Sequence, residues 1–291
     1  MKTKNFTLPF LLIFVISLLG CTNQQIRSRS SIVDYLYPNG SDVKEQPSVP
    51  TLRLPLNVGI AFVPDQKITS QGRNAWTGFT GTVGSALTSV SKSELLEKVA
   101  SGFRNLDYVN DIEVIPSVYL TASGGFSNLA QIQTMYGIDI IALVSYDQVQ
   151  FTDSGALSLT YWTIVGAYVV SGEKNDTSTM LDTVVYDIKS KKMLFRAPGT
   201  SVIKGQATPI NISKELRVDS IKGFNLAAEK MTTNLETQLE KFREKIKKNP
   251  EKVKIIQDKN YPKIGGGGKT SLYELILVLL IFGARRIFSN T

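Results

Sequence analysis

The chain has 291 residues, 42% of them hydrophobic, which is enough for one sizeable core together with linkers and termini. Histidine is absent and there is a single cysteine, which excludes Ser-His-Asp and Cys-His catalysis, histidine-containing zinc sites and an intramolecular disulfide. The net charge is +8, but residues 1–20 and 269–291 each contribute +2, so the body carries only +4 and gives no indication of nucleic-acid binding.

Residues 1–20 have the pattern of a secretory signal peptide. Lys2 and Lys4 form a basic start, an apolar run follows from position 10 to 19, and a small residue ends the segment. A permanent membrane anchor is the alternative, but the apolar run is shorter than the roughly 20 residues that a comfortable span requires. We therefore expect export of the chain.

The end of this segment resembles the lipobox of bacterial lipoproteins. Leu18, Leu19 and Gly20 precede Cys21, which is the one cysteine of the chain. The resemblance implies that lipoprotein maturation enzymes cleave after Leu18-Leu19-Gly20 and attach acyl chains such as palmitate to Cys21. The next residue, Thr22, is not aspartate, which by the same resemblance favours the outer membrane over the inner one. A lone structural cysteine is the alternative interpretation.

Residues 21–50 are mainly polar and contain three prolines, a composition typical of a tether. One short apolar cluster, at residues 32–37, could dock on the domain that follows.

Residues 51–249 alternate between the periodicities of strands and helices. We expect a mixed β-sheet of about five strands with helices packed on it, an α/β fold with α+β as the alternative. The expected strands are residues 56–63, 112–120, 138–144, 156–171, 180–189 and 193–195. The expected helices are residues 91–106, 127–136 and a long final one with an apolar stripe at Ile221, Phe224, Ala228, Met231, Leu235, Leu239, Phe242 and Ile246.

The element order is similar to that of the α/β domain of periplasmic assembly lipoproteins, such as the CsgG and TolB N-terminal groups. The resemblance depends on the "GID" at residues 137–139 before an apolar strand and on the "YDIKSKK" hairpin at residues 186–192. It implies a domain that binds proteins and assembles, although a fold alone assigns no task.

Within this domain no side chains are nominated for catalysis, metal or cofactor binding. The glycine-rich stretch 70–90 lacks the Gly-Lys-Ser/Thr ending of a P-loop, so a surface loop is the better interpretation. Its Trp76 and Phe79 could contact a partner or a membrane, or could be buried in the core. The carboxylates are scattered and offer no acid–base pair, namely Asp139, Asp147, Asp153, Asp182 and Asp187.

Residues 250–271 form a basic and glycine-rich linker. The basic run that enters it, residues 241–263, could attract anionic lipid headgroups, and a solvated stalk is the alternative.

Residues 272–291 form a hydrophobic tail that is too short for a stable membrane span. Two arginines, Arg285 and Arg286, follow its apolar part and would hold the C-terminus in the cytoplasm. Four glycines precede it, and glycine gives little helical stability, which is the property that an intramembrane protease needs at its cut site. These are Gly265, Gly266, Gly267 and Gly268.

Together with Cys21, this layout resembles the rhombotarget lipoproteins, whose GlyGly-CTERM tails are processed by rhombosortases. The resemblance implies cleavage within the four glycines, a transient membrane segment at residues 272–284 and a stop at the arginine pair. Glu274 and the five residues after Arg286 depart from the pattern.

The sequence therefore predicts a non-enzymatic lipoprotein in the envelope of a Gram-negative bacterium, at the outer membrane or cell surface. Its expected partners are the membrane, the maturation enzymes, a rhombosortase-type protease and an envelope protein, without nucleic acid or cofactor. Two alternatives stay open: an enzyme without histidine or cysteine chemistry, and a two-anchor structural lipoprotein that keeps its tail.

Overall fold

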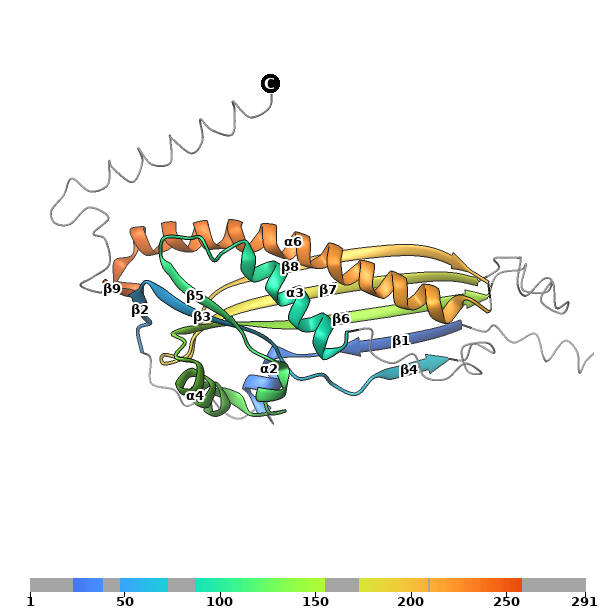
Figure 1. The fold of residues 1–291 in the computed structure, drawn as a ribbon, viewed down its shortest axis with the longest axis horizontal. Helices are drawn as coiled ribbons and strands as arrows, with labels where there is room; N and C mark the ends of the chain where they lie inside the picture. Colours follow the sequence, from blue (N-terminus) through green and yellow to red (C-terminus); the bar gives the residue numbers. More distant parts are fainter. Residues whose placement is uncertain (1–22, 39–47, 73–86, 155–172, 209, 258–291) are drawn as a thin grey trace, which may run out of the picture.

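The structure, a computed structural model, describes residues 23–38, 48–72, 87–154, 173–208 and 210–257. A long, twisted sheet forms the centre of the molecule (Figure 1). Helices α3 (Ser89–Ser101) and α6 (Ile212–Lys248) cover one face, and α2 (Ile32–Leu36) and α4 (Gly125–Tyr136) cover part of the other. Within the described residues, no helix is both long and apolar enough to cross a membrane.

The sheet is mixed, as predicted, and its organising strand is β6 (Ile140–Ser154). The first residues of β6 pair in parallel with β3 (Leu56–Phe62), which pairs in parallel with β5 (Val109–Val114). On its other edge β6 runs antiparallel to β7 (Glu173–Asp187) from Ile140↔Asp187 to Ser154↔Glu173. The hairpin partner β8 (Lys192–Ala207) follows β7 and ends the sheet on that side.

Two further strands come from segments that the sequence did not mark as strands. The C-terminal half of β6 pairs antiparallel with β1 (Asn23–Arg29), and β1 pairs with β4 (Thr69–Gly72). The main sheet therefore has seven strands instead of about five.

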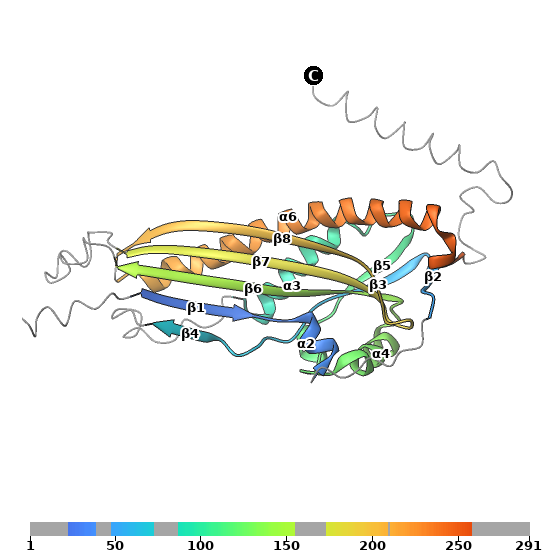
Figure 2. The same cartoon turned by 180° about the vertical axis from the view of Figure 1, so that it is seen from behind.

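The tether prediction for residues 21–50 is wrong for the part that the structure describes up to residue 37. The strand β1 lies inside the sheet between β4 and β6, and α2 buries Ile32, Tyr35 and Leu36 against the domain, as the apolar cluster suggested. The polar composition was misleading because, among the described residues, no helix covers one face of this half of the sheet (Figures 1 and 2), and polar side chains are tolerated there.

The C-terminal boundary at residue 249 is also wrong. After the single turn η4 (Pro250–Lys252), β9 (Lys254–Gln257) pairs in parallel with β2 (Thr51–Leu54) to make a separate two-stranded sheet. These four residues lie at one end of the molecule, beside the end of α6 (Figure 2). The linker therefore starts later than predicted.

The structure confirms one of the predicted element ends and shifts others by a few residues. Thr88, not Ser91, caps α3 by accepting a hydrogen bond from the Ser91 backbone nitrogen. Gly137 ends α4 in the left-handed conformation at φ +65°, as expected. The strand expected at 112–120 ends at Val114, because Pro116 follows and has no N–H to pair. The expected strand at residues 156–171 lies outside the described residues.

Candidate functional site

An apolar cavity of about 330 Å³ lies between the sheet and the helices α3 and α6. Residues of β2 and β9 line the cavity. These two strands lie together at one end of the molecule (Figure 1). Nine elements contribute to its wall, namely β2, β3, β5, β6, β7, β8, β9, α3 and α6, together with the connection from α3 to β5. Such a volume is at the lower end of the ~300–1,000 Å³ range of small-molecule pockets.

The apolar lining follows from two sequence periodicities. Alternate residues on β2 and β3 face the cavity, with Leu52 and Leu54 on β2 and Leu56 and Val58 among those on β3. On α6 the lining residues are spaced by three and four positions and form the end of the predicted stripe, namely Leu235, Leu239, Phe242 and Ile246.

The stripe prediction needs one correction at its start. Ile221 is 49% exposed, because Ser220, Gly223 and Phe224 provide the buried face of that part of α6. The long strands there present polar groups to the helix. Gln148 and Gln150 donate to the backbone carbonyls of Ser220 and Leu216. The apolar cavity is thus confined to the other end of α6.

The polar side chains of the lining lie close to one place, the junction between β2 and β3. They are Tyr108, Arg243 and Gln257. The guanidinium carbon of Arg243 lies 5.3 Å from the centroid of the Tyr108 ring, a cation–π arrangement. The backbone of Tyr108 accepts a hydrogen bond from Leu56, and Gln257 is in register with Leu54. Nearby Ile255 lines the cavity and is 45% exposed, so the cavity reaches solvent beside β9.

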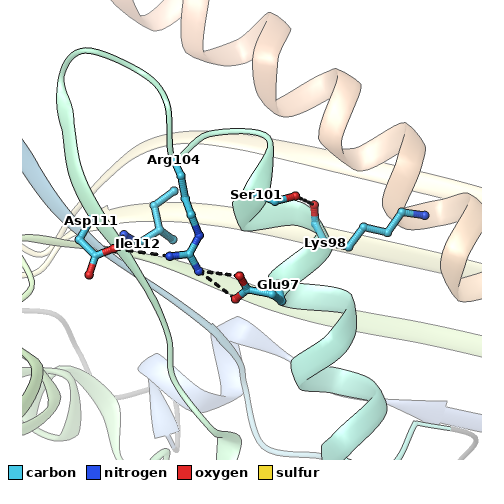
Figure 3. Close-up of polar contacts among 6 residues, drawn as sticks. All are labelled: Glu97, Lys98, Ser101, Arg104, Asp111 and Ile112. Carbon is cyan, nitrogen blue, oxygen red and sulfur yellow. Dashed lines mark hydrogen bonds and ion pairs between the residues drawn. The ribbon is translucent and has the colours of Figure 1, made fainter.

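A surface ion-pair cluster fixes the connection from α3 to β5, which supplies part of the cavity wall (Figure 3). Arg104 donates to both carboxylate oxygens of Glu97 on α3, at 2.8 and 2.9 Å, and to Asp111 on β5 at 3.5 Å. Between these anchor points the chain places Phe103, Leu106 and Tyr108 in the lining. Because Arg104 and Glu97 are 36% and 56% exposed, we expect the cluster to position this connection more than to stabilise the fold.

An empty cavity of this size is costly. At ~24 cal/mol per Å³, leaving 330 Å³ of apolar volume unfilled costs up to about 8 kcal/mol. The opening beside β9 lowers this figure, but the whole stability of a domain is only about 5–15 kcal/mol. An apolar group that fills the enclosed part of the cavity would therefore stabilise the domain.

The cavity lining contains few polar side chains. Across the described part of the wall, a phenol, a guanidinium and an amide are the polar side chains, and they supply no carboxylate beside a nucleophile. Among the residues that the structure describes, no group of three His, Cys, Asp or Glu side chains is arranged to hold a metal ion.

Of the predicted carboxylates, Asp139 and Asp187 line one polar pocket together with Lys189, whereas Asp147 and Asp182 each pair with an arginine. Asp147 pairs with Arg27, and Asp182 pairs with Arg196 at 2.7 Å. These contacts raise the pKa of each arginine, chiefly through the hydrogen bond to its carboxylate. Two others cap backbone groups, since Asp139 accepts from the Asn57 nitrogen and Asp187 accepts from the Ser190 nitrogen.

The predicted processing sites lie outside the residues that the structure describes. These sites are the lipidation site Cys21 with Leu18, Leu19 and Gly20, and the tail residues Gly265, Gly266, Gly267, Gly268, Arg285 and Arg286. The loop residues Trp76 and Phe79 also lie outside the described residues. The cavity, in contrast, was not predicted from sequence. The alternating leucines of residues 52–56 and the apolar stripe of α6 form its lining, but an ordinary filled core has the same sequence pattern.

Comparison with known proteins gives little further information. No protein-family model matches the chain, and no curated protein is detectably similar to it in sequence. One solved structure that aligns with it is that of a neuraminyllactose-binding hemagglutinin homolog from Helicobacter pylori, at 10% identity, over 74% of this chain and 97% of that one. The TM-score of 0.33 is too low to indicate a shared fold.

Proposed function

We propose that this protein is an exported envelope lipoprotein whose α/β domain binds the apolar chain of a ligand, without catalysis. The observation that carries the proposal is the 330 Å³ apolar cavity under β2 and β9. Each methylene that enters such a cavity contributes about 0.8 kcal/mol.

The volume limits what the ligand can be. An apolar cavity of about 150 Å³ binds the six carbons of benzene, so this cavity has room for roughly a dozen carbons. One turn of an α-helix, about 10 Å across and 5.4 Å long, occupies roughly 400 Å³ and does not fit. A single acyl chain is therefore the best-fitting occupant of the cavity interior.

The envelope location is supported by the sequence. Leu18, Leu19 and Gly20 before Cys21 favour lipid attachment by the maturation enzymes, and Thr22 favours the outer membrane. With acyl chains on Cys21, Thr22 alone would separate the anchor from β1, a reach of at most about 7 Å. The domain would then be held at the membrane surface.

Such an anchor would place the cavity far from the membrane. The start of β1 and the β2–β9 sheet lie at opposite ends of the molecule (Figures 1 and 2). The helix α6 runs between these ends, and its 37 residues extend for about 55 Å. An anchored domain would therefore present its binding site towards the periplasm or the exterior, where a ligand or an envelope partner is met.

Ligand extraction tests the binding function. We expect full-length protein, purified from native membranes in amphipol, to release about one non-covalent acyl-chain molecule per protein into organic solvent. Ala142 lines the cavity, so Ala142→Leu should lower this yield at least about threefold by filling the space. Ala130 is exposed on α4, and Ala130→Leu should leave the yield unchanged. Equal yields from all three proteins would exclude the cavity as the binding site.

The opposite positions of β1 and β9 also favour a second candidate, the two-anchor lipoprotein. If the tail stays in the inner membrane while Cys21 is held in the outer one, the domain bridges part of the space between them. Intact mass measurement distinguishes the two forms. A protein that begins at acylated Cys21 and ends within residues 265–268 indicates processing by a rhombosortase-type protease, whereas retention of residues 272–291 indicates two anchors.

A further inference from the structure

We infer that the ligand is a single-chain anionic amphiphile, with its acyl chain inside the cavity and its anionic head at Arg243. This inference rests on the proposed binding function and adds the polarity, charge and orientation of the ligand. It follows from where the polar atoms lie, which charges surround them and how much space remains.

The polar end of the cavity is well defined. Arg243 stacks on Tyr108 at 5.3 Å, and Tyr108 and Gln257 lie beside the junction of β2 and β3, next to Leu56 and Leu54 respectively. The remaining lining is aliphatic or phenylalanine, so a ligand with one polar end is oriented by the site. A head placed at the other end would lose its hydrogen bonds to water without replacement.

The charge at this end is positive. A guanidinium stays protonated in proteins and presents five N–H donors, and its Nη1 donates to Glu240 at 2.8 Å. The neighbouring segment 240–254 contains seven Lys or Arg residues and three Glu residues, a net charge of +4. This excess offsets the partial negative charge at the C-terminal end of α6 and attracts an anion.

Stacking gives Arg243 a defined direction. Contact with the Tyr108 ring restrains the flat guanidinium, and its side chain is 34% exposed, so it lies at the boundary between cavity and solvent. A guanidinium held in one orientation suits a planar carboxylate or the oxygens of a phosphate monoester, because its parallel N–H groups can bind two oxygens at once. Because the volume admits roughly a dozen carbons, a two-chain phospholipid does not fit.

A competition experiment tests the inference on the full-length protein, purified in amphipol and freed of bound lipid. The displacement of a fluorescent apolar probe is measured with dodecanoate, dodecyl phosphate and dodecanol, which share one chain and differ in the head. We expect each anion to bind at least about tenfold more tightly than dodecanol. The stronger of the two anions identifies the carboxylate or the phosphate as the preferred head.

Substitutions of Arg243 test whether this residue causes the preference for an anionic head. Arg243→Gln should reduce the advantage of the anions to less than about twofold, whereas Arg243→Lys should retain most of it because the charge remains. Lys230, exposed on α6 about 20 Å from Arg243 along the helix, provides the matched control, and Lys230→Gln should preserve the advantage.

The possible failures are distinguishable. If none of the three ligands displaces the probe from the wild-type protein, the proposed function fails. If dodecanol binds as tightly as the anions, or if Arg243→Gln leaves the advantage of the anions intact, acyl-chain binding stands and the assignment of Arg243 to an anionic head is overturned.

Discussion

Gly199 on β8 lies so close to Met231 on α6 that a Cβ atom at Gly199 would be 2.5 Å from the Met231 backbone nitrogen. The same Cβ would also collide with the carbonyl oxygen of Ala227. Backbone atoms cannot turn aside as a flexible side chain can. The glycine therefore permits the close approach of α6 to β8 at this point.

The first prediction concerns this contact. Gly199→Ala should lower the free energy of unfolding by about 2–3 kcal/mol, because α6 must move away from β8. Urea unfolding followed by circular dichroism measures the change. Gly102, whose Cβ would meet its nearest atom at an ordinary 3.5 Å, is the matched control, and Gly102→Ala should change stability by less than about 0.5 kcal/mol. Equal losses in the two variants would contradict the prediction.

The second prediction concerns a buried lysine. Lys92 is 5% exposed, its ammonium lies 2.5 Å from Asp65, and the rings of Phe62 and Tyr146 are 5.7 and 5.6 Å away. Asp65→Asn removes the countercharge and should cost roughly 2–3 kcal/mol, less than for a fully buried pair because the Asp65 side chain is 39% exposed.

Lys92→Met separates charge from packing in the same site. Methionine keeps most of the buried volume and leaves Asp65 able to reach water, so the loss should stay below about 1 kcal/mol. Thermal and urea unfolding of both variants give the comparison. A larger loss for Lys92→Met than for Asp65→Asn would show that the ammonium stabilises the fold and is not merely tolerated.

The third prediction concerns pH. Burial, and then the nearby carboxylate of Glu215, raise the pKa of Asp219 above its ordinary value, although Asn175 donates a hydrogen bond to it. A carboxyl whose folded pKa is raised contributes stability below the unfolded pKa of 3.8, and this contribution is lost as the pH rises through the folded value. The ionised Asp219 is therefore unfavourable at pH 7.

Asp219→Asn removes this titration and keeps an acceptor for Asn175. Urea unfolding between pH 3.5 and 7 should show nearly equal stabilities for variant and wild type at the acid end, with a growing advantage of the variant towards neutral pH. Glu215→Gln removes one cause of the shift and should reduce that advantage. A difference that does not vary with pH would exclude the titration of Asp219 as its origin.

The fourth prediction concerns β1, which has a neighbour on each side. Residues 24–27 of β1 are paired with both β4 and β6, so a proline at any of these positions removes a ladder hydrogen bond. Gln25→Pro should cost about 3 kcal/mol, while Gln25→Ala should cost less than about 1 kcal/mol. If both variants unfold at the wild-type urea concentration, β1 behaves as the tether that the sequence suggested.

The features that the sequence predicted correctly are those encoded by local periodicity. The stripe from Phe224 to Ile246 predicted α6 and its buried face, and the apolar run from 138 to 144 predicted the central strand. Both features follow from apolar residues spaced by two, three or four positions, and such a pattern depends only on residues that are close together in the chain.

What the sequence could not place are features that depend on distant segments. The polar strand β1 becomes a strand because β4 and β6 supply partners on both sides, and residues 23–29 alone do not encode this. The same holds for β2 and β9, where Leu54 and Gln257 meet across some two hundred residues.

The sequence by itself determined the mixed class of the fold, its long last helix and the residues that become apolar walls. Only the tertiary structure decided that those walls leave a space between them, because a cavity depends on how far apart nine elements are held and not on the hydrophobicity of any one of them. The same packing places Arg243, from an otherwise ordinary basic run, at the polar end of that space.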